Sequence, residues 1–280
     1  MPNSRQKTDL QPSAEKIGWL VYHPIDIPRN QWFIAELMKN AQLHGISMKL
    51  LSSQEIPPAE CPALLVNRSR DASWSRRCAL HGARVVNSTA VTEITNNKLS
   101  TFQFLHGKHG IPMAETVLYT AADAETPRIP LPCVAKPPDG HGGEGVAWIE
   151  CPEQLKAYAD THKQPFLLQE PMVTGWDVRV YVLGGEIYKA VLRTSDRDFR
   201  SNFSLGGDVS LYTPDAEMRE LVRKVHQVLP LDFAGVDFLR HPKGGYVVGE
   251  IEDAVGCRML YSLTDCDPAA DLMRLAADSI

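Results

Sequence analysis

A glycine-rich segment in the middle of the chain has residue types suited to holding phosphate groups. Residues 134–146 (VAKPPDGHGGEGV) run from an apolar stretch that ends at Lys136 into a loop with four glycines among residues 140–145. Backbone N–H groups of glycine can come close to an anion, and the lysine places a cation beside them. Because the glycines lead into a second strand, the segment is neither a Walker A loop nor a dinucleotide-binding turn. A structural hairpin turn remains the alternative to a phosphate site.

Three acidic residues near the end of the chain, Asp237, Glu250 and Glu252, have the spacing of a magnesium site. Glu250 and Glu252 are two residues apart in a predicted strand, so their side chains point to one face. Asp237 belongs to the preceding strand of the same predicted hairpin, where it can lie across from Glu250. Carboxylates on one face repel each other unless a cation lies among them, and Mg²⁺ bound through carboxylates and substrate phosphates fits this pattern. The alternative is that some of them simply face water.

Five arginines form a third set of candidate residues: Arg179, Arg193, Arg197, Arg200 and Arg258. Arg179 shares a strand face with Asp177, and Arg193 ends the next predicted strand. A single arginine on a strand commonly covers apolar surface with its alkyl stem. Several arginines that converge beside phosphate and metal would instead stabilise negative charge as it develops during a reaction.

The elements that position these residues change in character along the chain. Residues 17–90 alternate short apolar strands with helical stretches, which predicts a small parallel α/β layer. A helix capped by Asn96 or Asn97 is expected next, followed by strands on both sides of the glycine-rich loop. The later predicted elements are a hairpin turn at Gly184-Gly185, an amphipathic helix over 216–229 and a helix that begins at Asp267-Pro268.

Composition narrows the classes of protein that the chain can be. It has 280 residues, 44% of them hydrophobic, and a formal net charge of −5. This acidic balance argues against nonspecific nucleic-acid binding, and the most basic stretch, Arg193 to Arg200, is interrupted by Asp196 and Asp198. No run approaches the roughly 18–20 apolar residues of a membrane-spanning helix. The six cysteines show no C-x-x-C spacing, so we expect reduced thiols and a cytoplasmic location.

In their order along the chain, these motifs resemble those of an ATP-grasp ligase of the RimK and glutathione-synthetase type. The resemblance covers about residues 96–280 and rests on five segments. They are Asn97-Lys98 leading to GIPMAET; VAKPPDGHGGEGV; LLQEPMVTGWDVRVYVLGG; VLRTSDRDFRSNFSLGGD; and AGVDFL followed by GEIED. Five motifs in one order make a specific signature, although they do not name the substrate.

The resemblance implies an α/β (α+β) ATP-grasp fold preceded by a small parallel α/β pre-ATP-grasp domain. The expected divisions are a disordered tail at 1–15, the N-terminal domain at 16–92 and the ATP-grasp region at 93–280. Within that region, a central lid subdomain at about 112–172 is expected to precede a C-terminal subdomain at about 173–280.

The resemblance also implies a role for each matching residue. Lys98 and Lys136 would contact the nucleotide phosphates. Arg179, Arg193 and Lys136 would support the γ-phosphate and the acyl phosphate. Asp237, Glu250 and Glu252 fall on the magnesium-ligand positions. The remaining nucleotide-binding residues would be the loop residues Gly140, His141, Gly142 and Gly143, the adenine-side residues Gln169, Glu170, Pro171 and Met172, the ribose-side Asp177, and the phosphate-side Arg200, Ser201 and Asn202.

Two positions depart from the family pattern. The third metal ligand is commonly the asparagine of E-x-N, whereas this chain has Glu252, which adds a negative charge. The following segment, DAVGCRMLYS, lacks the usual serine-proline turn and offers Arg258 on what we expect to be a short loop. Arg258, together with Arg193, is a candidate for binding a substrate; a surface arginine is the alternative for Arg258. The departures argue against assigning ribosomal-protein glutamylation directly.

The implied activity is ADP-forming ligation of a carboxylate to an amine through an acyl phosphate, with ATP and two Mg²⁺ ions, for which Mn²⁺ can substitute. The expected substrates are an amino acid, a peptide or a small metabolite, with no nucleic-acid or membrane partner; a homo-oligomer is compatible with this expectation. Two alternatives stay open: a ligase with a thiol or hydroxyl acceptor, and an ATP-binding regulatory protein without turnover. The filled acid and lysine positions argue against the second alternative.

Overall fold

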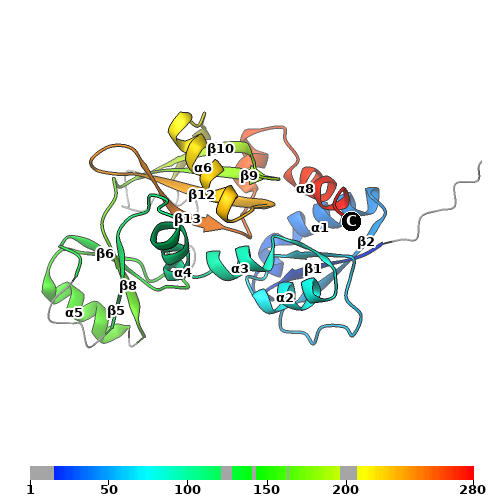
Figure 1. Ribbon diagram of the computed structural model, residues 1–280, viewed down its shortest axis with the longest axis horizontal. Coiled ribbons are helices and arrows are strands. Elements are labelled where there is room, and N and C mark those ends of the chain that lie inside the picture. The colour runs from blue at the N-terminus through cyan, green and yellow to red at the C-terminus, as the bar shows by residue number, and fades with distance from the viewer. Residues whose placement is uncertain (1–15, 121–127, 141–142, 163, 196–206) are drawn as a thin grey trace, which may run out of the picture.

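Three sheets follow one another along the chain in the computed structural model (Figure 1). The structure describes residues 16–120, 128–140, 143–162, 164–195 and 207–280. The expectations for the tail at 1–15, for His141 and Gly142, and for Arg197, Arg200, Ser201 and Asn202 lie outside the described residues.

The N-terminal layer is a parallel sheet in the order β2-β1-β3-β4. Trp19 and Val21 of the central strand pack into one apolar cluster, and Leu20 and Tyr22 pack into another. Strands buried on both faces are typical of a parallel sheet covered by helices, and the expected parallel layer is confirmed. Its elements are β1 (Lys16–Tyr22), α1 (Ile27–Leu43), β2 (Ile46–Ser52), β3 (Leu64–Asn67), α2 (Ala72–Leu80), β4 (Arg84–Val86) and α3 (Thr89–Thr95).

A short helical segment leads from this layer to the second sheet. It consists of α4 (Lys98–Phe102) and a π-helical turn at Gln103–Lys108. Asn97 is the N-cap, because its side-chain oxygen accepts a hydrogen bond from the Ser100 N–H at 3.0 Å. This confirms one of the two predicted caps. The backbone N–H of Lys98 donates to the Pro138 carbonyl at 2.7 Å, which fixes the start of the helix to the glycine-rich loop.

The second sheet is antiparallel, in the order β5-β8-β6-β7, and helix α5 (Pro152–Thr161) packs on it. Strands β6 and β7 flank the glycine-rich loop, and Cys133 of β6 pairs with Ile149 of β7. Lys136 is the last residue of β6, as the sequence predicts. The strands are β5 (Thr116–Tyr119), β6 (Cys133–Lys136), β7 (Ala147–Ile149) and β8 (Phe166–Gln169).

The third sheet is antiparallel, in the order β11-β10-β9-β12-β13, and it carries most of the candidate chemistry. Helix α6 (Ala216–Val228) buries Met218, Leu221, Val222 and Val225 in the apolar cluster that includes this sheet, which is the face that the spacing predicts. The strands are β9 (Trp176–Leu183), β10 (Glu186–Thr194), β11 (Asp208–Leu211), β12 (Phe233–Arg240) and β13 (Tyr246–Glu252).

Two helices, α7 (Arg258–Leu263) and α8 (Pro268–Ala277), end the chain, and α8 lies beside α1 of the N-terminal layer (Figure 1). The side chain of Asn87 also joins the layers, because it donates to the carbonyls of Phe233 at 2.7 Å and Asp253 at 3.0 Å. Asp267 caps α8 as predicted. Within the described residues, no helix has both the length and the apolar character needed to span a bilayer.

Arg258 does not lie on the short loop that the sequence predicts, because it is the first residue of α7. The six-residue helix gives little signal in the sequence, because its N-cap Cys257 makes no side-chain capping bond.

Candidate active site

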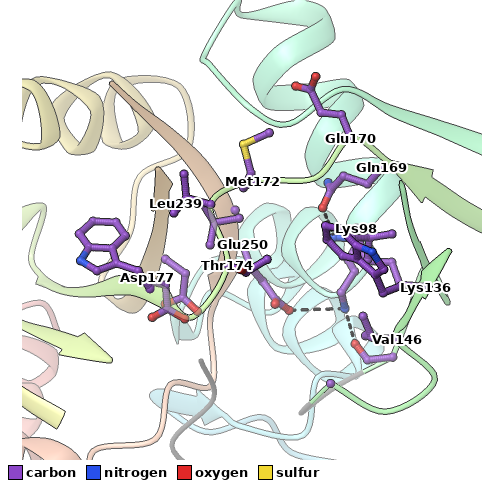
Figure 2. A pocket seen from close by; sticks show the side chains of 18 of the residues that line it. Lys98, Lys136, Val146, Gln169, Glu170, Met172, Thr174, Asp177, Leu239 and Glu250 are labelled. Carbon is purple, nitrogen blue, oxygen red and sulfur yellow. Dashed lines mark hydrogen bonds and ion pairs between the residues drawn. The ribbon is translucent and has the colours of Figure 1, made fainter. Parts of the chain in front are cut away.

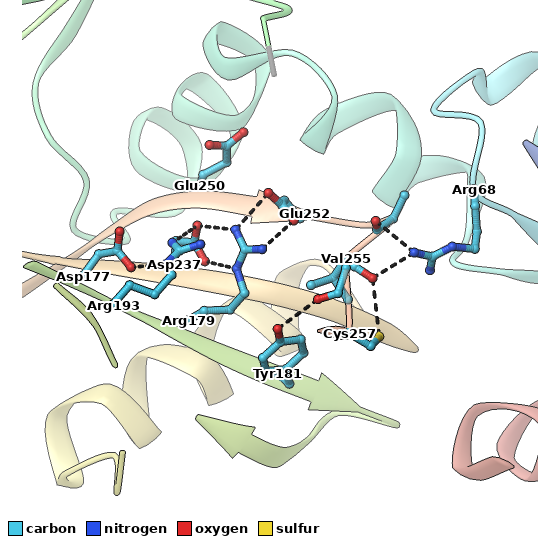
Figure 3. Close-up of polar contacts among 12 residues, drawn as sticks. Arg68, Asp177, Arg179, Tyr181, Arg193, Asp237, Glu250, Glu252, Val255 and Cys257 are labelled. Carbon is cyan, nitrogen blue, oxygen red and sulfur yellow. Dashed lines mark hydrogen bonds and ion pairs between the residues drawn. The ribbon is translucent and has the colours of Figure 1, made fainter. Parts of the chain in front are cut away.

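Four buried charged residues form a network across the middle strands of the third sheet. Arg179 of β9 lies opposite Asp237 of β12, and Asp177 of β9 lies opposite Arg193 of β10. Arg179 donates from Nε and Nη2 to the two carboxylate oxygens of Asp237, both at 2.7 Å, and Arg193 donates to Asp237 from Nη2 at 2.7 Å. Arg193 also pairs with Asp177. The register of β9 with its two neighbouring strands therefore brings these four residues into direct contact (Figure 3).

Glu252 extends the network toward the end of β13. Both oxygens of its carboxylate accept hydrogen bonds from Arg179, each at 2.8 Å (Figure 3). Arg179 thus joins two of the three acids that the sequence marks as metal ligands. Glu250 pairs directly with Asp237 in the strand register, as predicted, but its Oε1 lies 3.5 Å from the Nζ of Lys98.

Burial and charge act in opposite directions on this network. Burial would raise the pKa of Asp237, but the guanidinium groups of Arg179 and Arg193 outweigh burial and hold that pKa well below its ordinary value. Burial would lower the pKa of Arg179, but the carboxylates of Asp237 and Glu252 raise it instead. For Asp177 burial dominates, and its pKa rises to about 6 despite the ion pair with Arg193. Asp237 is therefore ionised at neutral pH.

A cavity of about 180 Å³ lies between the second and third sheets, and two lysines point into it (Figure 2). Lys136 Nζ donates to Gln169 Oε1 at 2.8 Å, and Lys98 Nζ donates to the Gly140 carbonyl. Desolvation, the largest effect, lowers the pKa of Lys136 to about 8; the neighbouring Lys98 acts in the same direction and Glu250 acts against it. With a pKa of about 8, Lys136 is still mostly protonated at neutral pH, and its ammonium group faces the same cavity as the Lys98 side chain.

Most of the predicted nucleotide-binding residues that the structure describes line this first cavity. They are Lys98, Lys136, Gly140, Gly143, Gln169, Glu170, Met172 and Asp177. Pro171 is not part of its wall, although it belongs to the same linker between β8 and β9. Glu170 is held in place by Glu115, because each residue's backbone N–H donates to an oxygen of the other at 3.0 Å.

The apolar walls of the first cavity are not among the site residues that the sequence predicts. Trp148, Trp176 and Leu239 line it, together with Val134 and Val146. Trp148 could have been found from its spacing, since it lies two residues after Val146 at the end of the glycine-rich loop. Apolar walls beside two lysines have the composition expected of a site for a nucleobase joined to phosphates.

A second cavity, of about 270 Å³, adjoins the first. The two share the walls Gly143, Arg193, Asp237 and Glu250. The other walls of the second cavity include Arg179 and Glu252, the α7 residues Arg258 and Tyr261, and the N-terminal residues Arg29, Trp32 and Arg68. The last three were missed because they lie far from the motifs in sequence. Arg258 Nη2 donates to the Arg29 carbonyl at 2.8 Å, which places the predicted substrate residue at this cavity.

The acidic set has the donor chemistry of a magnesium site, since Mg²⁺ prefers oxygen ligands. Asp237, Glu250 and Glu252 all face the second cavity, so the donors fit the ion in kind. In this structure, however, arginines bind both oxygens of Asp237 and both oxygens of Glu252. Among the described residues, no three His, Cys, Asp or Glu side chains are grouped to hold a metal ion. The three metal ligands therefore stay a prediction.

Comparisons of sequence place the chain among known ligases. Residues 95–276 match the model of the RimK-like ATP-grasp domain. Beta-citrylglutamate synthase B of Danio rerio is 32% identical over 217 residues, which cover 73% of this chain and 53% of that protein. The chain thus spans about half the length of this named relative. An uncharacterised protein of Mycoplasma pneumoniae is 26% identical over 266 residues, which cover 93% of this chain and 90% of that protein.

The fold agrees with the sequence comparisons. The ATP-grasp ligase PsnB, solved with a minimal precursor, has a TM-score of 0.71 at 17% identity over 95% of this chain and 100% of that chain. The predicted ATP-grasp fold is confirmed. The prediction of an ATP-grasp ligase is confirmed at the level of the family, whose named relatives are synthases and ligases. Since the matched domain takes up well over half of the chain and contains the lysines, acids and strand arginines described above, the chain belongs to the RimK-like ATP-grasp family.

Proposed function

We propose that the protein is an ATP-dependent, ADP-forming ligase that joins a carboxylate to an amine through an acyl phosphate. The observation that carries this proposal is the junction of the two cavities at Gly143, Arg193, Asp237 and Glu250. A nucleotide in the first cavity and an organic acid in the second would meet at this junction. The name of the zebrafish relative, a synthase of beta-citrylglutamate, supports amide formation.

The first cavity would hold ATP. Its apolar walls would take the adenine, and Lys98 and Lys136 would bind the phosphates. In the structure the Lys136 ammonium donates to the Gln169 side chain, so a hydrogen-bonding position for an oxygen is already formed at this atom. Gly140 and Gly143 would let the loop backbone approach the phosphates closely.

The reaction would proceed at the shared walls in two transfers. A carboxylate oxygen of the organic acid attacks the γ-phosphorus, and ADP leaves with the electron pair of the broken bond. The amine then attacks the acyl carbon, phosphate leaves, and the amine loses a proton. Arg179 and Arg193 would stabilise the negative charge that develops on the phosphoryl oxygens. Their ion pairs with Asp237 hold both guanidinium groups in position.

The same acids would hold magnesium. Asp237, Glu250 and Glu252 would bind up to two ions, which neutralise the charge of the phosphates when bound. Of the three acids, Glu250 has no arginine partner among the described residues and pairs instead with a lysine that itself faces the nucleotide cavity. Glu250 is therefore the acid best placed to exchange its present partner for an ion.

We also propose the division into an N-terminal domain at 16–92 and an ATP-grasp region at 93–280, with subdomains at about 112–172 and 173–280. The parallel sheet ends with β4 at Val86, and the match to the family model begins at residue 95. The second sheet then lies within residues 116–169 and the third within 176–252.

The test is release of phosphate and ADP, screened against pairs of carboxylic acids and amines, with mass spectrometry of the products. The proposal predicts that one pair yields an amide together with ADP and phosphate in equal amounts. A thioester or ester product would favour the ligase with a thiol or hydroxyl acceptor. Binding of Mg-ATP without ADP release for any pair would favour the regulatory protein without turnover.

A further inference from the structure

Arg68 is a buried cation without a carboxylate partner at the second cavity. Its side chain follows β3 of the N-terminal layer, and the residue is only 6% exposed. Nη2 donates to the carbonyls of Ala254 at 3.1 Å and Val255 at 2.8 Å (Figure 3). Nε is buried and has no hydrogen-bond partner in the described structure. A buried charge is costly unless it is paired, and Arg68 lines the second cavity, where a bound anion would supply the pairing charge.

Two aromatic rings pack against Arg68, and the buried carboxylate of Asp253 is near enough to act on its charge without forming an ion pair with it. Its guanidinium carbon lies 5.0 Å from the ring centroid of Phe33 and 5.6 Å from that of Tyr22. These rings hold the guanidinium group in one orientation but do not neutralise its charge. The cation is therefore fixed before any ligand binds.

Two further arginines line the same cavity with unneutralised charge. None of the described carboxylates forms an ion pair with Arg29 or Arg258. The hydrogen bond from Arg258 to the Arg29 carbonyl holds the two residues together at the wall. The cavity thus has two differently charged regions. At the junction with the first cavity, Arg179 and Arg193 form ion pairs with acids. No described carboxylate forms an ion pair with Arg29, Arg68 or Arg258.

An aromatic surface lies beside these arginines. Trp32 of α1 is 55% exposed although it is a large apolar residue, and its ring meets Tyr261 of α7 edge-on at 4.5 Å between centroids. Both residues line the second cavity. Such a surface favours contact with an apolar part of a ligand.

From these contacts we propose that the acyl donor is a dicarboxylic acid with an apolar body. One carboxylate reaches the shared walls and is activated there, the second carboxylate binds Arg68, Arg29 and Arg258, and the apolar body packs on Trp32. This inference rests on the proposed function for the orientation of the acid. Arg29, Trp32 and Arg68 all lie outside the residues matched by the family model, so the N-terminal layer selects the substrate.

Three matched probes test the proposal by calorimetry. Phenylsuccinate has two carboxylates and a ring, hydrocinnamate has the ring with a single carboxylate, and succinate has two carboxylates without a ring. They are titrated into the full chain with and without Mg²⁺ and a non-hydrolysable ATP analogue. We expect phenylsuccinate to bind at least about tenfold more tightly than either control, since a charge-assisted contact and an aromatic contact are each worth this much.

Variants of single residues show which side chains cause the preference for phenylsuccinate. Arg29→Gln removes an exposed positive charge and should lower the affinity for phenylsuccinate toward that for hydrocinnamate. Trp32→Ala should lower the affinity toward that for succinate. Arg68→Met should abolish the preference for the second carboxylate; unchanged binding of the ATP analogue shows that this variant is folded. Arg223→Gln, on an exposed i,i+3 pair of α6, is the control and should change nothing.

Equal affinities for phenylsuccinate and hydrocinnamate would overturn the carboxylate site, as would Arg29→Gln and Arg68→Met variants that keep the wild-type preference. Failure of every probe to bind, while the ATP analogue binds, would overturn this inference and leave the proposed nucleotide site standing. Failure of the ATP analogue itself would count against the proposed function. In that case, titration of the three probes without nucleotide would still show whether the second cavity prefers the dicarboxylic acid with a ring.

Discussion

Asp237 and Glu250 lie directly opposite each other on β12 and β13, yet their carboxylates are neutralised from different parts of the fold. Asp237 is buried and accepts hydrogen bonds from Arg179 and Arg193 of the same sheet. Glu250 is more exposed and lies 3.5 Å from Lys98 at the start of α4. The first acid is therefore fixed within the sheet, whereas the second connects the sheet to the nucleotide cavity.

This difference predicts separate consequences for the two acids. Glu250→Gln should lower turnover by about a hundredfold or more, because it removes the acid best placed to bind magnesium, while the urea midpoint of unfolding stays near that of the wild type. Asp237→Asn should lower turnover similarly and also destabilise the fold by about 3 kcal/mol, because it removes the buried carboxylate that Arg179 and Arg193 share. Phosphate release and urea unfolding measure the two effects.

The matched control for stability is Glu220→Gln, which removes the carboxylate of an exposed pair with Arg223 on α6. Its unfolding midpoint should equal that of the wild type, since exposed pairs contribute little. Near wild-type ligation by Glu250→Gln at low Mg²⁺ would show that this acid does not bind the ion.

Glu252 stands where the family commonly has asparagine, and substitutions at this position test what the glutamate contributes. Glu252→Asn, which restores the common residue, should reduce turnover less than Glu252→Ala, because the amide oxygen can still accept from Arg179 or bind magnesium. Turnover measured over a range of Mg²⁺ concentrations compares the variants. Equal losses in the two variants would show that an amide oxygen cannot replace the carboxylate at this position.

Lys136 should make ATP binding depend on pH. The ammonium group is protonated below its pKa of about 8, so ATP affinity should be highest below that pH and fall as the pH rises through it. Bound phosphates favour the charged form, and binding near that pH should therefore take up protons. Calorimetry in buffers of different ionisation enthalpy measures both effects.

Two substitutions of Lys136 test how far its positive charge contributes to ATP affinity. Lys136→Met should weaken ATP binding roughly tenfold to a hundredfold at neutral pH, the usual effect of losing a charged hydrogen bond. Lys136→Arg stays protonated at alkaline pH, so any ATP affinity that it keeps should not decline as the pH rises. An unchanged ATP affinity in Lys136→Met would exclude this lysine from the phosphate site.

Arg258 should affect an organic substrate and not the nucleotide. Arg258→Ala should raise the KM for one organic substrate while the KM for ATP stays nearly constant, because the residue lines only the second of the two cavities. Arg258→Lys should already be impaired, since lysine lacks the planar fork that binds a carboxylate through two hydrogen bonds. Steady-state kinetics with each substrate varied in turn decides the point. A rise in the KM for ATP alone would assign the residue to the phosphate site.

The parts of the fold that follow local rules could be predicted from the sequence. The amphipathic spacing of α6, the cap at Asn97 and the pairing of Asp237 with Glu250 all depend on residues close in sequence or in one hairpin. The short helix α7 could not be predicted, because it has six residues and no capping side chain.

The N-terminal walls of the second cavity could not be predicted from the sequence for a different reason. Arg29, Trp32 and Arg68 come from α1 and the end of β3, and only packing of the N-terminal layer against the third sheet brings them near Arg258. Contacts between distant layers leave no periodic signal in the chain. The sequence predicts Arg179 and Arg193 beside the phosphates but does not predict their ion pairs with the acids. These ion pairs follow from the register of β9 with its neighbouring strands.

The most direct test of the account is the fate of a labelled oxygen atom during turnover. An acid identified by the screen is prepared with heavy oxygen in its carboxylate and is converted to the amide with ATP and the amine. Attack of the carboxylate on the γ-phosphorus predicts that the released phosphate carries one heavy oxygen atom for each amide formed. Phosphate without the label, or label found in AMP, would contradict the acyl-phosphate route.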